Sequence, residues 1–153
     1  MLSLALILAP KPMLTIAGRT AEFAPRILLP LVGGRVPAGF PSPADDYIEG
    51  RIDLNEHLIR NKEATFIFRV KGWSMLKAGI HDGDELIVDR SVEPCHRHIV
   101  VAVVNGQLTV KRLHKRARVV RLLSENDDHP CIEFKDGDEL QIWGVVTTVL
   151  HKV

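Results

Sequence analysis

The sequence predicts a mainly β fold of short antiparallel strands with one or two short helices, preceded by an extended N-terminal arm. Three observations predict it. Seven of the nine prolines lie before residue 44, one helical pattern follows them, and from residue 64 onward short Val- and Ile-rich runs alternate with turn residues. A chain of 153 residues, 46% of them apolar and 25% charged, has the composition of one soluble domain with a tail.

The arm is rich in proline, which has no backbone N–H to donate to a strand ladder. We therefore expect the residues up to about 44 to be extended and not packed. The apolar run ILLPLV at 27–32 could still lie along a surface or a partner.

Residues 1–12 are apolar but interrupted by two prolines, and they are too short for a bilayer, which needs about 20 apolar residues. We expect a flexible leader or a true start at Met13, with a cleaved secretory signal as the less favoured alternative.

A short helix is expected directly after the arm, because Asp53 can cap it and Glu56 stands at its third position.

Asn105-Gly106 predicts a tight hairpin, since a type I′ turn needs positive φ at both residues. The motif DGDEL, at 82–86 and 136–140, predicts one kind of turn used twice before a strand. The predicted strands are TFIFRVK (65–71), ELIVDR (85–90), HIVVAVV (98–104), QLTVKRL (107–113), RVVRLL (118–123), CIEF (131–134) and ELQIWGVVTTVL (139–150).

Charge and cysteine content exclude several functions. A net charge of +1 argues against bulk electrostatic binding to nucleic acid. Cys95 and Cys131 are far apart and form no CxxC pair, so neither a disulfide framework nor a zinc ribbon is predicted. A reducing, cytoplasmic setting fits best.

Ser74 is the serine whose position suggests chemistry. It stands where the strand FIFRVKG ends and the turn SMLKAG begins, a junction that exposes a side chain and directs backbone N–H groups outward, as an oxyanion requires. The sequence GWSML is not GxSxG, so an α/β-hydrolase elbow is not indicated. A serine that only caps a turn is the alternative interpretation.

Lys111 lies among apolar residues of the predicted strand 107–113. Strand alternation puts it on one face with Thr109 and Leu113, and Arg112 on the other, so one of the two cations must share a face with apolar neighbours. If Lys111 is buried, its pKa falls and its neutral amine can accept a proton from a serine hydroxyl. A lysine at a sheet edge that extends to water is the alternative.

The seven histidines leave two further interpretations open. A Ser/His/Asp triad is not excluded by spacing, because triads are defined by geometry. His96 and His98 beside Cys95 could ligate zinc with a residue such as Cys131, although a polar connecting loop is favoured. We therefore predict no metal and no cofactor.

Six cations occur within eleven residues. We favour a solvated face over contacts to DNA phosphates because no aromatic residues are interleaved, with docking of a partner as the remaining alternative. They are Lys111, Arg112, Lys115, Arg116, Arg118 and Arg121.

Three blocks of the sequence resemble the LexA/UmuD self-cleaving family, and most closely its UmuD branch. The blocks are VPAGFPSPADDYIEGRIDLNEHLI (36–59), KGWSMLKAGIHDGDELIVDRS (71–91) and NGQLTVKRL (105–113), and the resemblance extends from about Arg35 to the C-terminus. It implies the LexA C-terminal-domain-like (β-clip) fold. It also implies a serine peptidase with a Ser/Lys dyad that acts on its own chain.

By this resemblance Ser74 is the nucleophile and Lys111 the general base, and the N–H groups of Trp73 and Ser74 form the oxyanion hole. Trp73 replaces the acidic residue of the UmuD branch. The family cleaves at Ala-Gly or Cys-Gly a few residues before FPSP, and Ala38-Gly39 has that position.

Cleavage there would remove the arm, residues 1–38, and leave a β domain of residues 39–153. The arm is too short for the helical DNA-binding module of a LexA-type repressor, which favours the UmuD role.

The resemblance further implies an SOS-response protein that acts in DNA repair after DNA damage. A RecA filament on single-stranded DNA would trigger cleavage, and the processed homodimer would serve a UmuC-like Y-family polymerase in translesion synthesis, the process of SOS mutagenesis. Neither sequence-specific DNA binding nor membrane association is expected. The alternative is a non-cleaving protein-binding module, or a LexA-family regulator, whose arm only docks on a partner.

Overall fold

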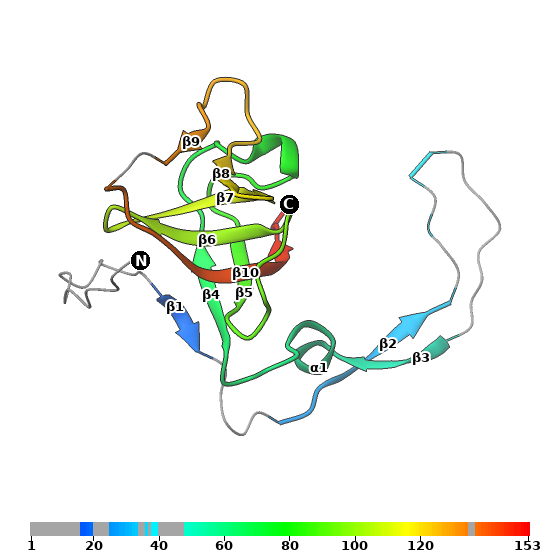
Figure 1. The fold of residues 1–153 in the computed structure, drawn as a ribbon. Helices are drawn as coiled ribbons and strands as arrows, with labels where there is room; N and C mark the ends of the chain where they lie inside the picture. The colour runs from blue at the N-terminus through cyan, green and yellow to red at the C-terminus, as the bar shows by residue number, and fades with distance from the viewer. Residues whose placement is uncertain (1–15, 20–24, 34–35, 37, 40–47, 135–136) are drawn as a thin grey trace.

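The computed structural model describes residues 16–19, 25–33, 36, 38–39, 48–134 and 137–153. Its strands form one large and one small sheet (Figure 1). In chain order the elements are β1 Ile16–Arg19, β2 Leu28–Val32, β3 Ile48–Asp53, α1 Leu54–Leu58, β4 Thr65–Arg69, the 3-10 helix η1 Leu76–Ala78, β5 Glu85–Asp89, β6 Ile99–Val104, β7 Gln107–Arg116, β8 Val119–Leu123, β9 Ile132–Glu133 and β10 Leu140–Leu150.

The large sheet has eight strands in the order β1-β4-β5-β10-β6-β7-β8-β9, and every neighbouring pair is antiparallel. The seven strands predicted from Thr65 onward are β4 to β10, so the predicted mainly β, antiparallel fold is confirmed. β10 pairs with both β5 and β6 and thereby joins the two halves of the sheet.

The turn predictions are also confirmed. Asn105 and Gly106 have φ of 47° and 78°, and they connect β6 to β7 with Val104 opposite Gln107. In the two DGDEL motifs Gly83 and Gly137 have positive φ, 86° and 95°, and the motifs lead into β5 and β10.

The predicted helix is α1, and Asp53 is its N-cap. The Asp53 carboxylate accepts a hydrogen bond from the Asn55 N–H at 2.8 Å, and Glu56 lies in the first turn. The backbone N–H of Asn55 is one of the groups at a helix start that have no partner within the helix. With η1, the described chain has the one or two short helices that the sequence predicts.

Of the arm, the structure describes residues 16–19, 25–33, 36 and 38–39, and parts of these are paired, which was not predicted from the sequence. β1 pairs with β4 at the edge of the large sheet, and β2 pairs with β3 in the small one. Pro30 lies within β2 opposite Arg51, a position that a two-stranded sheet tolerates. The predicted leader, residues 1–12, and Met13 lie outside the described residues.

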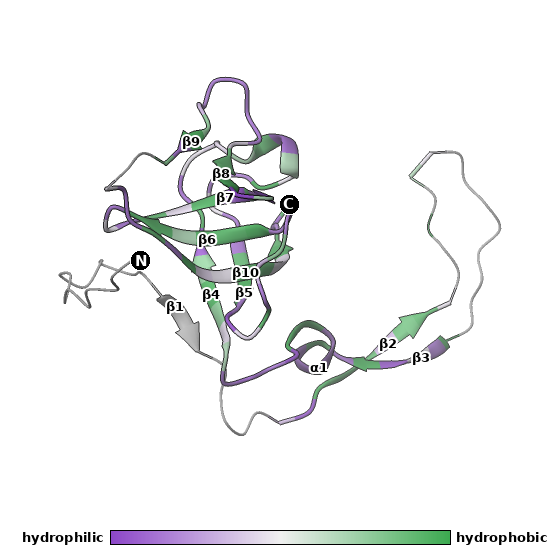
Figure 2. Cartoon of the chain, in the orientation of Figure 1, coloured by the Kyte–Doolittle hydropathy of each residue, from purple (hydrophilic) through white to green (hydrophobic). Residues whose placement is uncertain are grey.

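Two apolar clusters hold the large sheet, and β6 contributes to both. Strand alternation places Val101 in the first cluster and Val100 and Ala102 in the second. The apolar character of β6 is visible in Figure 2, where this strand is green. The first cluster is Phe66, Phe68, Met75, Ile80, Leu86, Val88 and Val101, and the second is Val100, Ala102, Leu113, Leu122 and Val145. In the described part of the chain no helix is long and apolar enough to cross a membrane.

Candidate active site

Three contacts fix the turn that carries Ser74. Met75 beside it is 2% exposed and belongs to the first apolar cluster, so the turn is anchored in the core. The Ser74 carbonyl accepts a hydrogen bond from the Glu125 N–H at 2.8 Å. The Trp73 carbonyl accepts one from the Asn126 side-chain amide at 2.7 Å. The core therefore fixes the turn from below, and the segment after β8 fixes it from the side.

The backbone at the start of this turn is set by Gly72. Its φ of 96° lies in the region that favours glycine, and its N–H donates to the Asp82 carboxylate at 2.5 Å. The N–H groups of Trp73 and Ser74 that follow have no acceptor among the described residues. Within the described residues, two backbone N–H groups of the serine turn are therefore free to donate to a bound group.

Lys111 reaches Ser74 from β7. Its Nζ donates to the Ser74 Oγ at 2.7 Å, across 37 residues of sequence. Lys111 is 7% exposed, so the alternative of an edge lysine extending to water is wrong. Burial lowers the pKa of its amine below the ordinary value for lysine.

Arg112, the neighbouring cation, points away from this site, as strand alternation requires. Its side chain forms an ion pair with Glu125 and also donates to the Arg97 carbonyl at 2.7 Å. Of the two cations that could share a face with apolar neighbours, Lys111 is therefore the buried one.

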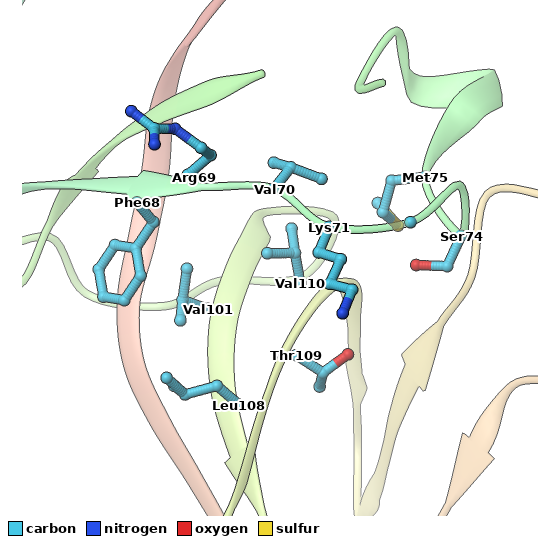
Figure 3. A pocket seen from close by; sticks show the side chains of 11 residues that line it. Phe68, Arg69, Val70, Lys71, Ser74, Met75, Val101, Leu108, Thr109 and Val110 are labelled. Carbon is cyan, nitrogen blue, oxygen red and sulfur yellow. The ribbon is translucent and has the colours of Figure 1, made fainter. Parts of the chain in front are cut away.

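A groove of about 250 Å³ opens beside Ser74 (Figure 3). Ser74 lies at one end of it, while Phe68 and Leu108 lie at the other, apolar end. The groove is lined by Phe68, Arg69, Val70, Lys71, Gly72, Ser74, Met75, Val101, Leu108, Thr109 and Val110. A histidine is not among these residues, so within the described chain the groove gives no support to a histidine triad.

The Ala38-Gly39 bond is not in this groove. Both residues are exposed. The strands that flank them, β2 and β3, project away from the large sheet (Figure 1). Gly39 has open space where a side chain would stand, so its backbone is accessible.

The residues considered as zinc ligands, Cys95, His96 and His98, lie in the loop before β6 and contact other protein groups. His96 Nδ1 lies 3.2 Å from the Lys115 backbone nitrogen and its Nε2 lies 3.0 Å from Arg116 Nε, and the unprotonated one of the two accepts a hydrogen bond. His98 Nδ1 accepts from the Cys95 N–H. Both cysteines are exposed and unpaired. The favoured interpretation of a polar loop agrees with these contacts.

The basic run does not form one surface. Lys111 is buried, Arg112 pairs with Glu125, and Arg121 lies 3.4 Å from Glu133. These ion pairs agree better with the solvated face that we favoured than with a strip for DNA phosphates.

One cluster of polar side chains was missed from the sequence. His81, Asp84 and His151 meet beside the turn of Ser74. The DGD turn that contains Asp84 was predicted, but His151 lies 67 positions further along the chain. Sequence spacing therefore gave no sign that the two residues are neighbours.

Comparison with known proteins shows the family to which the chain belongs. The family model described as Peptidase S24-like matches residues 30–147. The protein SamA of Salmonella typhimurium is 46% identical over 123 residues, which cover 80% of this chain and 85% of SamA. The protein MucA of Escherichia coli is 44% identical over 78% of this chain and 82% of its own length. The LexA repressor of Paracidovorax citrulli is 35% identical over 82% of this chain and 55% of the repressor. The chain belongs to the Peptidase S24-like family, the LexA/UmuD family of self-cleaving serine peptidases that its sequence resembles.

Proposed function

We propose that this protein is a UmuD-like serine peptidase that cleaves its own Ala38-Gly39 bond. The hydrogen bond between the buried Lys111 amine and the Ser74 hydroxyl is the observation that carries the proposal. A serine hydroxyl is a weak nucleophile unless a base accepts its proton, and a desolvated lysine can be that base near neutral pH.

The chemistry follows from these groups. Lys111 in its neutral form accepts the Ser74 proton along the 2.7 Å contact while Oγ attacks the Ala38 carbonyl carbon. The N–H groups of Trp73 and Ser74 stabilise the oxyanion, and the protonated lysine gives its proton to the Gly39 amine as the bond breaks. Water then releases the acyl group of Ala38 from Ser74 by the reverse sequence of proton transfers. The burial of Lys111, which is 7% exposed, keeps the amine desolvated.

The substrate must move to reach Ser74, because the bond lies outside the groove. Its exposure and the small side chains of Ala38 and Gly39 allow its backbone to approach the serine. Either the chain's own arm or that of a second copy enters. Tethering supplies the proximity, so the groove does not need high affinity for a foreign peptide. We propose that a RecA filament on single-stranded DNA favours this movement.

The cleaved product, residues 39–153, would lose β1 and β2. Their departure frees the hydrogen-bonding edges of β4 and β3, which a second copy or another protein can then pair with.

The net charge of the product differs from that of the full chain. Four of the 20 Lys and Arg residues and one of the 19 Asp and Glu residues precede Gly39, which leaves 16 cationic and 18 acidic residues and a net charge of −2. We propose that the product acts in the cytoplasm as a homodimer that binds a UmuC-like translesion polymerase, and not as a DNA binder.

A second candidate is a non-cleaving module whose arm docks on a partner. It is favoured by the apolar surface of β2, which Figure 2 shows in green and on which Leu28, Leu29 and Leu31 are each more than 40% exposed. In this case Ser74 would have no role in activity.

Dyad variants separate the two candidates. We expect purified wild-type chain incubated with RecA, ATP and single-stranded DNA to be cleaved, whereas Ser74→Ala and Lys111→Ala lose cleavage by more than about a thousandfold. Lys115→Ala is the matched control, because Lys115 is an exposed lysine of the same strand, β7. Gel electrophoresis over time measures the rates. Cleavage of Ser74→Ala at the wild-type rate would exclude the dyad, and an intact wild-type chain would favour the docking module.

A further inference from the structure

A histidine, an aspartate and a second histidine converge at the end of the large sheet, on the turn that leads into β5. One nitrogen of His81, one of His151 and a carboxylate oxygen of Asp84 lie within 4.8 Å of one another. His151 Nδ1 is 2.6 Å from Asp84 Oδ1, and His81 Nδ1 is 3.5 Å from Asp84 Oδ2. Asp84 is 4% exposed, so its carboxylate is held rigidly.

His81 Nδ1 has no hydrogen-bond partner although it is buried from solvent. Buried polar atoms are almost always paired, so an unpaired imidazole nitrogen that faces a carboxylate needs an explanation. The Asp84 carboxylate already accepts the His81 backbone N–H at 2.8 Å, and this contact fixes the turn without using the ring. The ring nitrogen is therefore available to a ligand.

We propose that His81, Asp84 and His151 form a binding site for a divalent transition-metal ion of the zinc type. Two imidazole nitrogens and one carboxylate oxygen are the ligand set that Zn²⁺ accepts when three protein ligands leave one position for water. Mg²⁺ and Ca²⁺ prefer ligand sets made of oxygen alone.

The geometry needs only a small adjustment to hold such an ion. Tetrahedral Zn²⁺ with bonds of about 2.0–2.1 Å separates its ligands by about 3.3 Å, which lies within the separations found here. His151 follows the last residue of β10 and its side chain is 48% exposed, so it can shift. Asp84 and His151 also line a cavity of about 250 Å³, which leaves room for a water ligand.

A bound ion would connect the C-terminal residues to the turn that carries Ser74. The His81 ring lies 6.3 Å from the ring of Trp73, edge to face, and 4.9 Å from the ring of His151. Trp73 is the residue before the serine. The site is thus adjacent to the groove, yet none of its three side chains lines it.

Metal titration of the full-length chain tests the site. The Ser74→Ala chain, without a polyhistidine tag, is titrated calorimetrically with ZnCl₂ at pH 7.5, and in parallel with CoCl₂ while the visible absorption of tetrahedral Co²⁺ is followed. We expect one ion per chain. His151→Gln and His81→Gln should each weaken Zn²⁺ binding by more than about tenfold and abolish the Co²⁺ band.

The control is the double variant His96→Gln/His114→Gln. Its two rings are also 4.9 Å apart, but both ring nitrogens of His96 already face protein N–H donors, one of which is the Arg116 side chain. This variant should bind Zn²⁺ like its parent. Circular dichroism confirms that each variant is folded. The proposal is overturned if the parent chain binds no Zn²⁺ up to millimolar concentration, or if binding survives both His81→Gln and His151→Gln.

Discussion

At the scale of single residues, the candidate site depends on one contact between two distant parts of the chain, Ser74 in the turn before η1 and Lys111 in β7. Each residue taken alone had an ordinary structural explanation, and only resemblance to a family joined them. The structure shows Lys111 buried and its amine 2.7 Å from the serine oxygen, which alternation along β7 allowed but did not determine. The cluster of His81, Asp84 and His151 was not predicted, because sheet packing and not sequence spacing brings it together.

The lowered pKa of Lys111 predicts how cleavage depends on pH. Burial shifts this pKa below 10.5, so the neutral, basic form of the amine increases as pH rises and is complete before an exposed lysine would be. Without RecA, cleavage of the wild-type chain should therefore accelerate above pH 7 and reach half of its maximal rate below pH 10.5. Rates measured at half-unit intervals by gel check this. A flat profile from pH 7 to 10 would contradict a lysine base.

At the scale of elements, the strands from β4 onward were predictable because each buries a regular apolar pattern between recognisable turns. β1, β2 and β3 were not predicted. Their sequences lie in or next to the proline-rich arm, and their pairing depends on partners distant in the chain: β1 joins β4, and β2 joins β3 across the FPSP segment. Local propensity contains no information about such pairings.

Gly144 tests the packing of β10, the strand that joins the two halves of the sheet. A Cβ at this position would stand 2.8 Å from Val88 Cγ1 and 3.3 Å from the Asp89 carbonyl oxygen. Val88 is fully buried and cannot move aside. We expect Gly144→Ala to lower the free energy of unfolding by about 1–3 kcal/mol in urea titrations.

The matched control is Gly50→Ala in β3, where a Cβ would meet nothing within 4 Å. Its free energy of unfolding should change by less than about 0.5 kcal/mol. If the two substitutions lowered the free energy of unfolding equally, the close approach of β10 to Val88 would not be the reason why position 144 needs glycine.

At the scale of the whole molecule, the core and the arm are separate in sequence. Among the residues whose burial the structure describes, those of the two apolar clusters all lie at Phe66 or beyond it. The division at residue 38 remains a proposal. Its structural support is that β1 and β2 contribute edge pairing to β4 and β3, and that no residue of β2 belongs to the clusters.

This arrangement predicts that residues 39–153 fold without the arm. Expressed directly, this segment should unfold cooperatively in urea, because both clusters remain, and it should show increased self-association by analytical ultracentrifugation, because the edges of β4 and β3 are free. The full-length Ser74→Ala chain is the reference. The absence of a cooperative transition in 39–153 would contradict the division of the chain at this bond.

The most direct measurement is intact-mass spectrometry of the wild-type chain after incubation at pH 10, beside Ser74→Ala under the same conditions. The proposed mechanism predicts a fragment that begins at Gly39 and its complement that ends at Ala38, in the wild type alone. A chain that stays intact, or the same fragments from Ser74→Ala, would contradict self-cleavage by Ser74. A break at another bond would contradict the proposed Ala38-Gly39 site.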